Sequence, residues 1–246
     1  MSLVYGINPV VEALKAGRVR RLKVSARNDR RMDEIVALAA KRGVPIDRVD
    51  PLALDRAAKG GVHQGVVAEI DAAPDLSIED LVGAAGEARP ALIVVLDGIE
   101  DPHNVGAILR TCDAAGVGGV VRQARHSAAL DGVVSKSSAG ALAHVRIATV
   151  VNIARAIEEL KEAQVWTIGL AGDAQTLYSD VDWTLPSAIV LGAEGTGLRR
   201  LVRERCDRLV RLPMLGAVDS LNVSVAAGVV LYEAVRQRAG LHSAQR

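Results

Sequence analysis

The sequence predicts an α/β protein in which a small α/β domain precedes a larger domain with a mostly parallel sheet and helices on both faces. From residue 91 onward, runs rich in Val, Ile and Leu alternate with helix-like segments, as in parallel sheets with crossover helices. The run at 91–96 is apolar without interruption, which is typical of a parallel strand buried on both faces. Small residues gather over 71–90. We therefore expect domains at 1–70 and 91–246, joined by a linker at 71–90.

Helices and strands alternate in the first seventy residues. Asn8 can cap a helix that tolerates Pro9 in its first turn and that Gly17 ends. Leu22 and Val24 alternate with basic neighbours, which predicts a half-buried strand. The complete set of expected elements is a helix over 8–17, a strand over 20–26, a helix ending at Gly43, a strand over 45–49, a helix over 50–60 and a strand over 64–70. In the linker, Ser77 and Asp80 are spaced to cap one short helix.

The larger domain continues the same alternation. Strands are expected over 91–96, 119–122, 145–150, 165–170, 188–191 and 209–212, and helices over 105–115, 130–137, 153–163, 198–205 and 223–238. Residues 223–231 are apolar nearly all round, so we expect the last helix to be enclosed by the fold.

Composition excludes several classes of protein. The 246 residues are 50% hydrophobic and 24% charged, an ordinary globular balance. No apolar run approaches the ~18–20 residues needed to span a bilayer, and the N-terminus lacks a basic stretch followed by an apolar block. We expect a cytoplasmic chain with no membrane partner. Cys112 and Cys206 cannot form a disulfide framework, and His, Cys and acidic residues do not cluster, so we expect no metal.

Positive charge is concentrated at the N-terminal end. Residues 1–70 hold thirteen Lys and Arg against eight Asp and Glu, a net charge of +5, although the whole chain carries only +1. Such a segment can attract a phosphate backbone, or it can simply be the solvated face of a small domain. Aromatic residues make up 2% of the chain and Phe is absent, which argues against binding single strands by base stacking.

Three polar or glycine-rich loops follow predicted strands, where ligands of open α/β sheets bind. The first contains Asp-Pro-His-Asn-Val-Gly at 101–106 and then Arg110. Asn104 can be a functional amide or a plain helix cap, and Arg110 can reach a phosphate or hydroxyl or form a surface ion pair.

The second loop has three glycines within 192–197 around Glu194, which permits close backbone approach to a ligand. Its order differs from the dinucleotide fingerprint, which weakens the alternative of a nicotinamide-dependent oxidoreductase. The carboxylate of Glu194 is either functional or favoured by a helix N-terminus. The third loop runs over 211–224, where Ser220 and Asn222 open the apolar helix. These two polar side chains either serve a site or cap each other. Neither a nucleophile elbow nor a P-loop occurs in the sequence.

Together, the three loops resemble the three motifs of the SpoU/TrmH-type RNA 2′-O-ribose methyltransferases, which belong to the SPOUT class. The matching runs are 101–110, 191–198 and 212–226. Residues 5–10 and 62–66 are similar to the L30e-like substrate-binding domain that precedes the catalytic domain in part of the family. The resemblance covers nearly the whole chain, and three motifs in order make it specific.

The resemblance implies a trefoil-knotted catalytic domain, an exception to the rule that chains avoid knots. It also implies S-adenosylmethionine as cofactor and a homodimer in which the last helix and the helix after 101–104 pack across the two-fold axis. The cofactor contacts it implies are Gly192, Leu212 and Leu221, with Leu170, Gly172 and Met214 adjoining.

The implied reaction is attack of a ribose 2′-hydroxyl on the sulfonium methyl group. The resemblance makes Arg110 the residue that activates this hydroxyl, with Asn104, Glu194, Ser220 and Asn222 arranging the site. Because arginine stays protonated in proteins, Arg110 acts either as an unusual general base or as a stabiliser of the alkoxide and neighbouring phosphate.

The implied substrate is RNA, either 23S rRNA, with a guanosine favoured, or tRNA. The basic first domain would bind its phosphates. An alternative of another class is a non-catalytic rRNA-binding protein, which a cofactor-binding measurement would distinguish from the enzyme.

Overall fold

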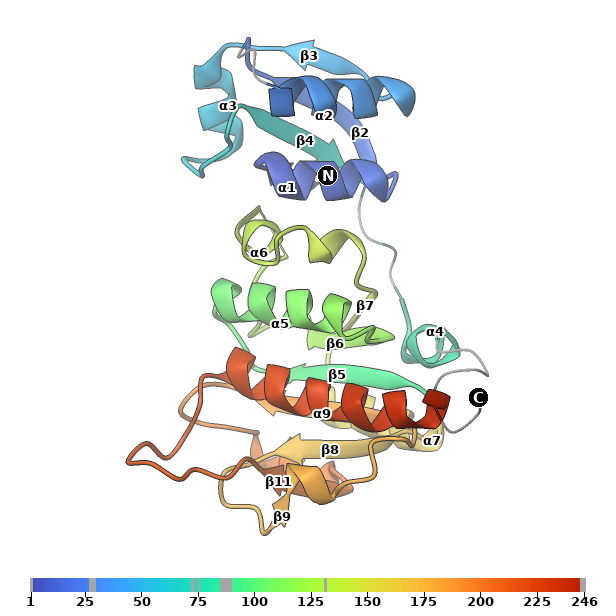
Figure 1. Ribbon diagram of the computed structural model, residues 1–246. Helices are drawn as coiled ribbons and strands as arrows, with labels where there is room; N and C mark the ends of the chain where they lie inside the picture. Colours follow the sequence, from blue (N-terminus) through green and yellow to red (C-terminus); the bar gives the residue numbers. More distant parts are fainter. Residues whose placement is uncertain are drawn as a thin grey trace. The chain divides into compact units, whose positions relative to one another are not determined.

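The protein is described by a computed structural model covering residues 2–26, 30–71, 74, 76–84, 90–130 and 132–243. The parts of the expected linker at 72–73, 75 and 85–89 lie outside these described residues. The chain divides into two compact units (Figure 1). Unit 1 combines Met1–Pro74 with Val105–Arg110 and Ala129–His144, and unit 2 contains the remainder of the chain. The expected α/β class, with a mostly parallel sheet and a smaller preceding sheet, is confirmed.

Unit 1 is built on a mixed sheet with the strand order β1-β4-β2-β3. Its strands are β1 (Ser2–Tyr5), β2 (Val19–Val24), β3 (Ile46–Arg48) and β4 (Val66–Ile70). Its helices are α1 (Ile7–Lys15), α2 (Arg30–Lys41), α3 (Pro51–Ala57), α6 (Gly132–Ser137) and the 3₁₀ turn η1 (Ala141–Ala143). The amphipathic faces of α1 and α2 meet the sheet in a core that includes Leu14, Leu22 and Ile35.

The start of α1 differs from the prediction. The helix begins at Ile7 with Gly6 as its N-cap, at a φ of +91°, and Asn8 lies inside it. The unpredicted strand β1 ends at Tyr5, so only a glycine conformation can turn the chain from strand to helix within one residue. The amide of Ile7 is satisfied by Gln64, whose Oε1 accepts it at 3.0 Å. The side chain of Gln64, which is distant in sequence, therefore accepts from an amide at the start of the helix, as Asn8 was expected to do.

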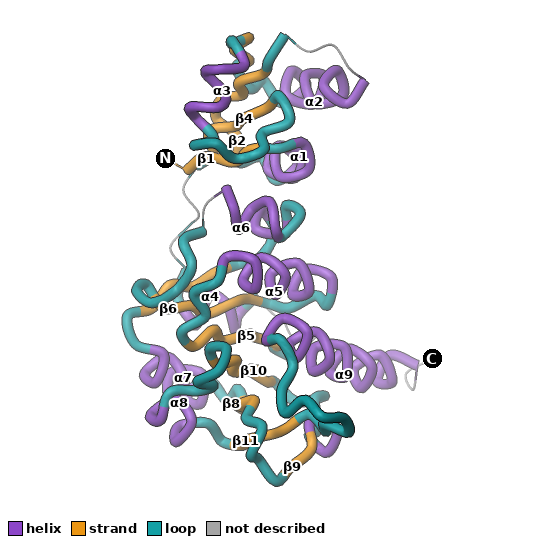
Figure 2. The backbone as a smooth tube through the Cα atoms, turned by 90° about the vertical axis from the view of Figure 1, so that its left-hand side faces the viewer, coloured by secondary structure: helices purple, strands orange, loops and turns teal. Residues whose placement is uncertain are grey.

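Unit 2 is built on an entirely parallel sheet with the strand order β7-β6-β5-β10-β8-β11-β9 among the described residues. Its strands are β5 (Leu92–Asp97), β6 (Gly119–Gln123), β7 (Ile147–Val150), β8 (Trp166–Leu170), β9 (Thr176–Leu177), β10 (Ser187–Gly192) and β11 (Arg208–Arg211). Its helices include α7 (Ile153–Glu162), α8 (Arg200–Arg205) and α9 (Val223–Ser243), while α5 (Pro102–Ala114) is shared between the units. Figure 2 shows α9 on one face of the sheet and α7 and α8 on the other. In a parallel sheet the carboxyl ends of the strands share one edge, so the loops after β5, β8, β10 and β11 gather there.

Part of the expected linker belongs to unit 2. Residues Ile78–Gly83 form the helix α4, which begins with the expected capping box: the Ser77 hydroxyl accepts from the Asp80 amide, and the Asp80 carboxylate accepts from the Ser77 amide. Ile78 and Leu81 are buried in the same core as Ile93 and Ile157.

The last helix is enclosed on one side only, contrary to the prediction. Val223, Ala227 and Val230 are buried, whereas Val225 and Tyr232 are about half exposed. A helix packed on one face of a sheet can bury only the residues that face it, however apolar the others are. Among the described residues, no helix is both long and apolar enough to cross a membrane, and no group of three or more His, Cys, Asp or Glu could hold a metal ion.

Arg238 fastens α9 to the amino end of the sheet. Its Nε donates to the carbonyl of Trp183 at 2.7 Å, and its Nη1 and Nη2 donate to those of Pro90 and Ala91 at 2.6 and 3.0 Å. Nη2 also donates to the carbonyl of Leu185 at 2.9 Å. Burial lowers the pKa of the Arg238 guanidinium. One side chain therefore satisfies carbonyls on both segments that lead into the neighbouring strands β5 and β10.

Substitution of Arg238 tests this anchor. We expect Arg238→Ala to lower the free energy of unfolding by about 2–4 kcal/mol, because part-buried carbonyls lose their donors. Arg236→Ala is the matched control. Arg236 lies two residues before Arg238 on the same helix, is exposed and pairs with Glu233. Its substitution should change the free energy of unfolding by less than about 0.5–1 kcal/mol. Urea unfolding followed by circular dichroism measures both, and equal losses would contradict the anchoring role.

Candidate functional site

The loop after β5 places an asparagine at the carboxyl edge of the sheet. Asp101 caps α5, with its carboxylate accepting from the amides of His103 and Asn104 at 3.1 Å each. Asn104 is therefore not the cap, and its side chain remains available although the residue is buried. Its Nδ2 donates to Glu194 Oε1 at 3.0 Å. These contacts favour the interpretation of Asn104 as a functional amide over its interpretation as a helix cap.

The glycine loop after β10 presents the carboxylate that Asn104 meets. The loop closes on itself: the Ala193 amide donates to the Gly197 carbonyl at 3.1 Å, and the Gly197 amide donates back at 2.8 Å. A Cβ on Gly192 would lie 2.2 Å from the carbonyl carbon of Gly197, so any side chain would force the loop open. Gly195 and Gly197 both have positive φ. These glycines produce the tight turn that presents Glu194.

The segment after β11 brings a second asparagine to Glu194. Asn222 Nδ2 donates to Glu194 Oε1 at 2.7 Å and to Asn104 Oδ1 at 2.9 Å. Its own Oδ1 accepts from the amide and hydroxyl of Ser224 at 2.9 and 2.6 Å, in the first turn of α9. Asn222 is therefore both a helix cap and a member of the cluster. Ser220 is outside the hydrogen-bonded cluster, since its hydroxyl donates to Asp219 at 3.1 Å.

A cavity of about 690 Å³ lies beside this cluster, within the size range of small-molecule sites. It is formed by the loops that follow β8 and β10 and by the segment that leads into α9. Its lining includes the predicted residues Leu170, Gly172, Gly192, Glu194, Ser220, Leu221 and Asn222. The lining combines leucines and glycines with polar and charged side chains such as Asp173 and Arg203.

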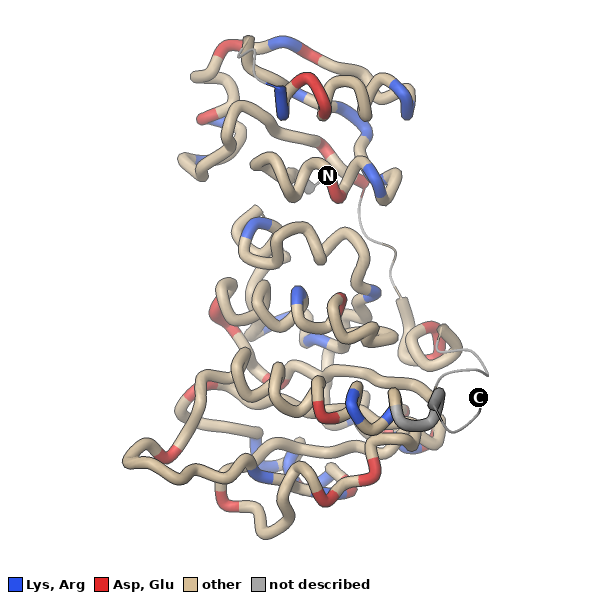
Figure 3. Tube along the Cα trace, in the orientation of Figure 1, with Lys and Arg blue, Asp and Glu red and all other residues tan. Residues whose placement is uncertain are grey.

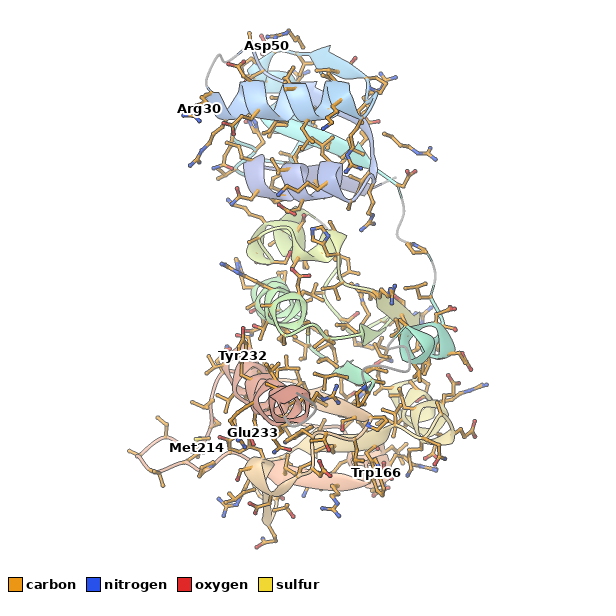
Figure 4. The ribbon with its side chains drawn as sticks, turned by 45° about the vertical axis from the view of Figure 1, so that its right-hand side comes forward. Arg30, Asp50, Trp166, Met214, Tyr232 and Glu233 are labelled. Carbon is orange, nitrogen blue, oxygen red and sulfur yellow. The ribbon has the colours of Figure 1, made fainter. Side chains whose placement is uncertain are left out.

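Not every predicted residue lines this cavity. Leu212 and Met214 do not, although they belong to the segment between β11 and α9, where Figure 4 shows Met214. Asn104 instead lines a second cavity of about 540 Å³, whose wall also contains Glu194. Arg110 follows on α5 with an exposed side chain and lines neither cavity.

An ion pair at the larger cavity was not predicted. Arg203 donates through Nη1 and Nη2 to both carboxylate oxygens of Asp173, at 2.8 and 2.9 Å. These bonds hold the pKa of Asp173 below its ordinary value. Both residues line the cavity. Nothing in the local sequence around 173 signals this pairing, because its partner lies 30 residues away on another element.

Comparison with known proteins accounts for this arrangement. Residues 91–232 match the sequence model of the SpoU rRNA Methylase family, and residues 3–76 match the one described as RNA 2′-O ribose methyltransferase substrate binding. The 23S rRNA (guanosine-2′-O-)-methyltransferase RlmB of Pseudomonas putida is 44% identical over 244 residues, which is 97% of each chain. The RlmB of Xylella fastidiosa is 46% identical over 242 residues, 96% of each chain.

A solved structure agrees with the sequence matches. The SpoU methyltransferase AviRb from Streptomyces viridochromogenes, in complex with the cofactor AdoMet, superimposes with a TM-score of 0.81 at 26% identity. The match covers 97% of this chain and 90% of that one. The resemblance inferred from the three loops is confirmed, and the chain belongs to the SpoU rRNA methylase family.

Proposed function

We propose that this protein transfers the methyl group of S-adenosylmethionine to a ribose 2′-hydroxyl in RNA, with a guanosine of 23S rRNA as the substrate. The observation that carries the proposal is the cluster of Asn104, Glu194 and Asn222 at the border of two cavities. Relatives named as 23S rRNA guanosine 2′-O-methyltransferases align with nearly the whole chain. The same chemistry on tRNA is the alternative. An rRNA substrate implies that the protein acts in the cytoplasm.

We propose that the larger cavity, of about 690 Å³, holds the cofactor. We propose that Leu170 and Leu221 contact its flat base, while the backbone at Gly172 and Gly192 approaches it closely. When bound, S-adenosylmethionine supplies a methyl group activated by a sulfonium centre. Leu212 and Met214 precede Leu221 in the same segment, and we propose them as apolar contacts at the margin of the site.

The asparagine–glutamate cluster is suited to orient a hydroxyl group. Oε1 of Glu194 accepts from both asparagine side chains, which fixes the carboxylate plane. Oε2 of Glu194 has no hydrogen-bond partner among the described residues, so it can accept from an incoming hydroxyl. We propose that Asn104, Glu194 and Asn222 orient the ribose in this way, and that Ser220 contributes its hydroxyl at the cavity wall.

Arg110 is proposed as the residue that activates the hydroxyl. Its guanidinium is exposed and has no hydrogen-bond or ion-pair partner in the described part of the chain. A group that stays protonated stabilises a developing alkoxide and clamps an adjacent phosphate more readily than it removes a proton. Either role, stabiliser or general base, requires the arginine.

A homodimer is proposed from the outer face of α9. Val225, Val229 and Tyr232 are 51%, 37% and 53% exposed and recur at helical spacing, so they form one apolar stripe. Tyr232 projects outward from α9 in Figure 4. Gly228 on the same helix lies close to α5, since a Cβ added to it would be 3.9 Å from the side chain of Thr111. A continuous stripe of this kind on a long helix is typical of a helix–helix interface.

A trefoil knot is proposed for unit 2. The segment between β11 and α9 passes beside the loop after β10, since Asn222 bonds to Glu194, and α9 then packs against β10. A C-terminal segment that passes beside an earlier loop and then packs on the sheet suits a knotted topology. Such threading would explain how three loops distant in sequence form one site.

Unit 1 is proposed to bind RNA phosphates. Figure 3 shows Lys and Arg distributed over α2 and the strands of this unit. Some are paired, such as Lys23 with Glu69 at 2.6 Å, but Lys41 and Arg42 are exposed at the end of α2. Exposed cations that can exchange counterions for phosphates suit an RNA-docking surface. The match to a substrate-binding family over 3–76 supports this assignment.

The first test is substitution of Arg110. We expect the wild-type protein with S-adenosylmethionine to methylate one ribose of 23S rRNA, located by mass spectrometry, and Arg110→Ala to reduce the rate by at least about 100-fold. The melting temperature should be unchanged, because the side chain is exposed. Arg155→Ala is the control, an exposed arginine on α7 paired with Glu159. Normal methylation by the Arg110 variant would exclude the assigned role.

A second test concerns the dimer. We expect Val229→Lys to halve the mass measured by light scattering, from twice 25.8 kDa to 25.8 kDa, because it places a charge in the apolar stripe. Val151→Lys, at a position 84% exposed beside α7, should leave the mass unchanged. A wild-type monomer, or a Val229→Lys dimer, would disprove this interface.

A third test concerns RNA docking. The dissociation constant for a 23S rRNA fragment should rise by about 10-fold or more between about 50 and 200 mM salt. The double variant Lys41→Ala/Arg42→Ala should flatten the dependence, lowering the log–log slope by about two. The variant Arg155→Ala/Lys161→Ala removes two cations from α7 and should keep the wild-type slope. A dissociation constant that does not change with salt concentration would rule out electrostatic docking.

A further inference from the structure

Asp97 is a fully buried carboxylate at the carboxyl end of β5. Arg199 surrounds it with donors: its backbone amide lies 2.9 Å from Oδ2, and its Nε and Nη2 lie 2.6 and 2.5 Å from Oδ1. A buried carboxylate is costly unless it is paired and hydrogen-bonded, so this arrangement depends on Arg199.

The same guanidinium also reaches a second strand, β6. Arg199 Nη2 also donates to Gln123 Oε1 at 2.8 Å, at the end of β6. Gln123 is fixed in turn, since its Nε2 donates to the carbonyl of Val151 at 3.2 Å. Arg199 therefore joins the ends of β5 and β6 to the chain that leaves the glycine loop.

This contact closes the loop that carries Glu194. The loop begins at Gly192, which pairs with Asp97 in the register of β10 and β5, and Arg199 is the first residue after it. Both ends of residues 192–198 are thus held at one residue, Gly192 by strand pairing with Asp97 and Arg199 by bonds to the Asp97 carboxylate. Within the loop, the reciprocal bonds between Ala193 and Gly197 leave little freedom for Glu194.

We propose that Asp97 and Arg199 are positioning residues for methyl transfer, acting through the glycine loop to hold Glu194 against Asn104 and Asn222. The inference rests on the proposed function, in which Glu194 orients the ribose. A planar fork is required, because Arg199 places two nitrogens, Nε and Nη2, on Asp97 while Nη2 also reaches Gln123. A lysine supplies the charge through a single nitrogen and cannot reproduce the paired contact to Asp97. A shift of Glu194 by about 1 Å is enough to reduce the rate by about 100-fold.

The test compares four variants of the full chain: Arg199→Lys, Glu194→Gln, their combination, and Arg200→Lys. Arg200 is the matched control, because it is the next residue and forms only an exposed pair with Glu204 at 2.8 Å. We expect Arg199→Lys to lower kcat by about 10- to 100-fold, with the Kd for S-adenosylmethionine changing less than kcat. In the Glu194→Gln background, Arg199→Lys should lower kcat by less than about threefold, since the effects of residues that act as one unit are not additive.

Hydrogen exchange provides a readout that does not depend on activity. Arg199→Lys should accelerate amide exchange in peptides covering 192–198, while exchange in β5 and the Arg200→Lys control stay as in the wild type. Unchanged loop exchange would overturn the positioning role, and so would equal losses of kcat in both backgrounds. If the wild-type protein methylates no RNA, the proposed function fails, and the exchange result alone then decides whether Arg199 holds the loop.

Discussion

One oxygen atom of Glu194 joins parts of the chain that are far apart in sequence. It accepts from Asn104, 90 residues earlier, and from Asn222, 28 residues later. Charge-assisted bonds of this kind are stronger than neutral ones, and here they are made at the edge where the strands end. Moving any one of the three loops would leave amide groups without partners. Glu194 lies in the walls of both cavities, so the cluster stands at their shared border.

The regular elements were predictable because their signals are local. The run at 91–96 became β5, and the pattern over 153–163 became α7, within one or two residues. Two strands were missed. β9 has only two residues, and β1 is defined by pairing with β4, which lies far along the chain. The last helix exposed the limit of composition, since an apolar sequence does not reveal which side a sheet covers.

Three of the candidate residues, Asn104, Glu194 and Asn222, meet in the structure, but the hydrogen bonds that connect them were not predictable. Asn104 and Asn222 were both open to interpretation as caps; the structure gives the first cap to Asp101 and shows that Asn222 does both tasks. The ion pair of Asp97 and Arg199 is invisible in the sequence, because its two members are 102 residues apart and each has an ordinary local context. Tertiary contacts of this kind carry no periodicity and no motif.

The short helix α4 belongs to the core of unit 2, ahead of the segment that starts at residue 91. Leu81 is fully buried, and a Cβ on Gly119 would lie 2.6 Å from one of its methyl groups, so this leucine fills a space that β6 leaves by having no side chain there. A truncated polypeptide starting at residue 91 would open a hole at that point. Anyone seeking to express the second half by itself should retain the stretch from Ser77 onward.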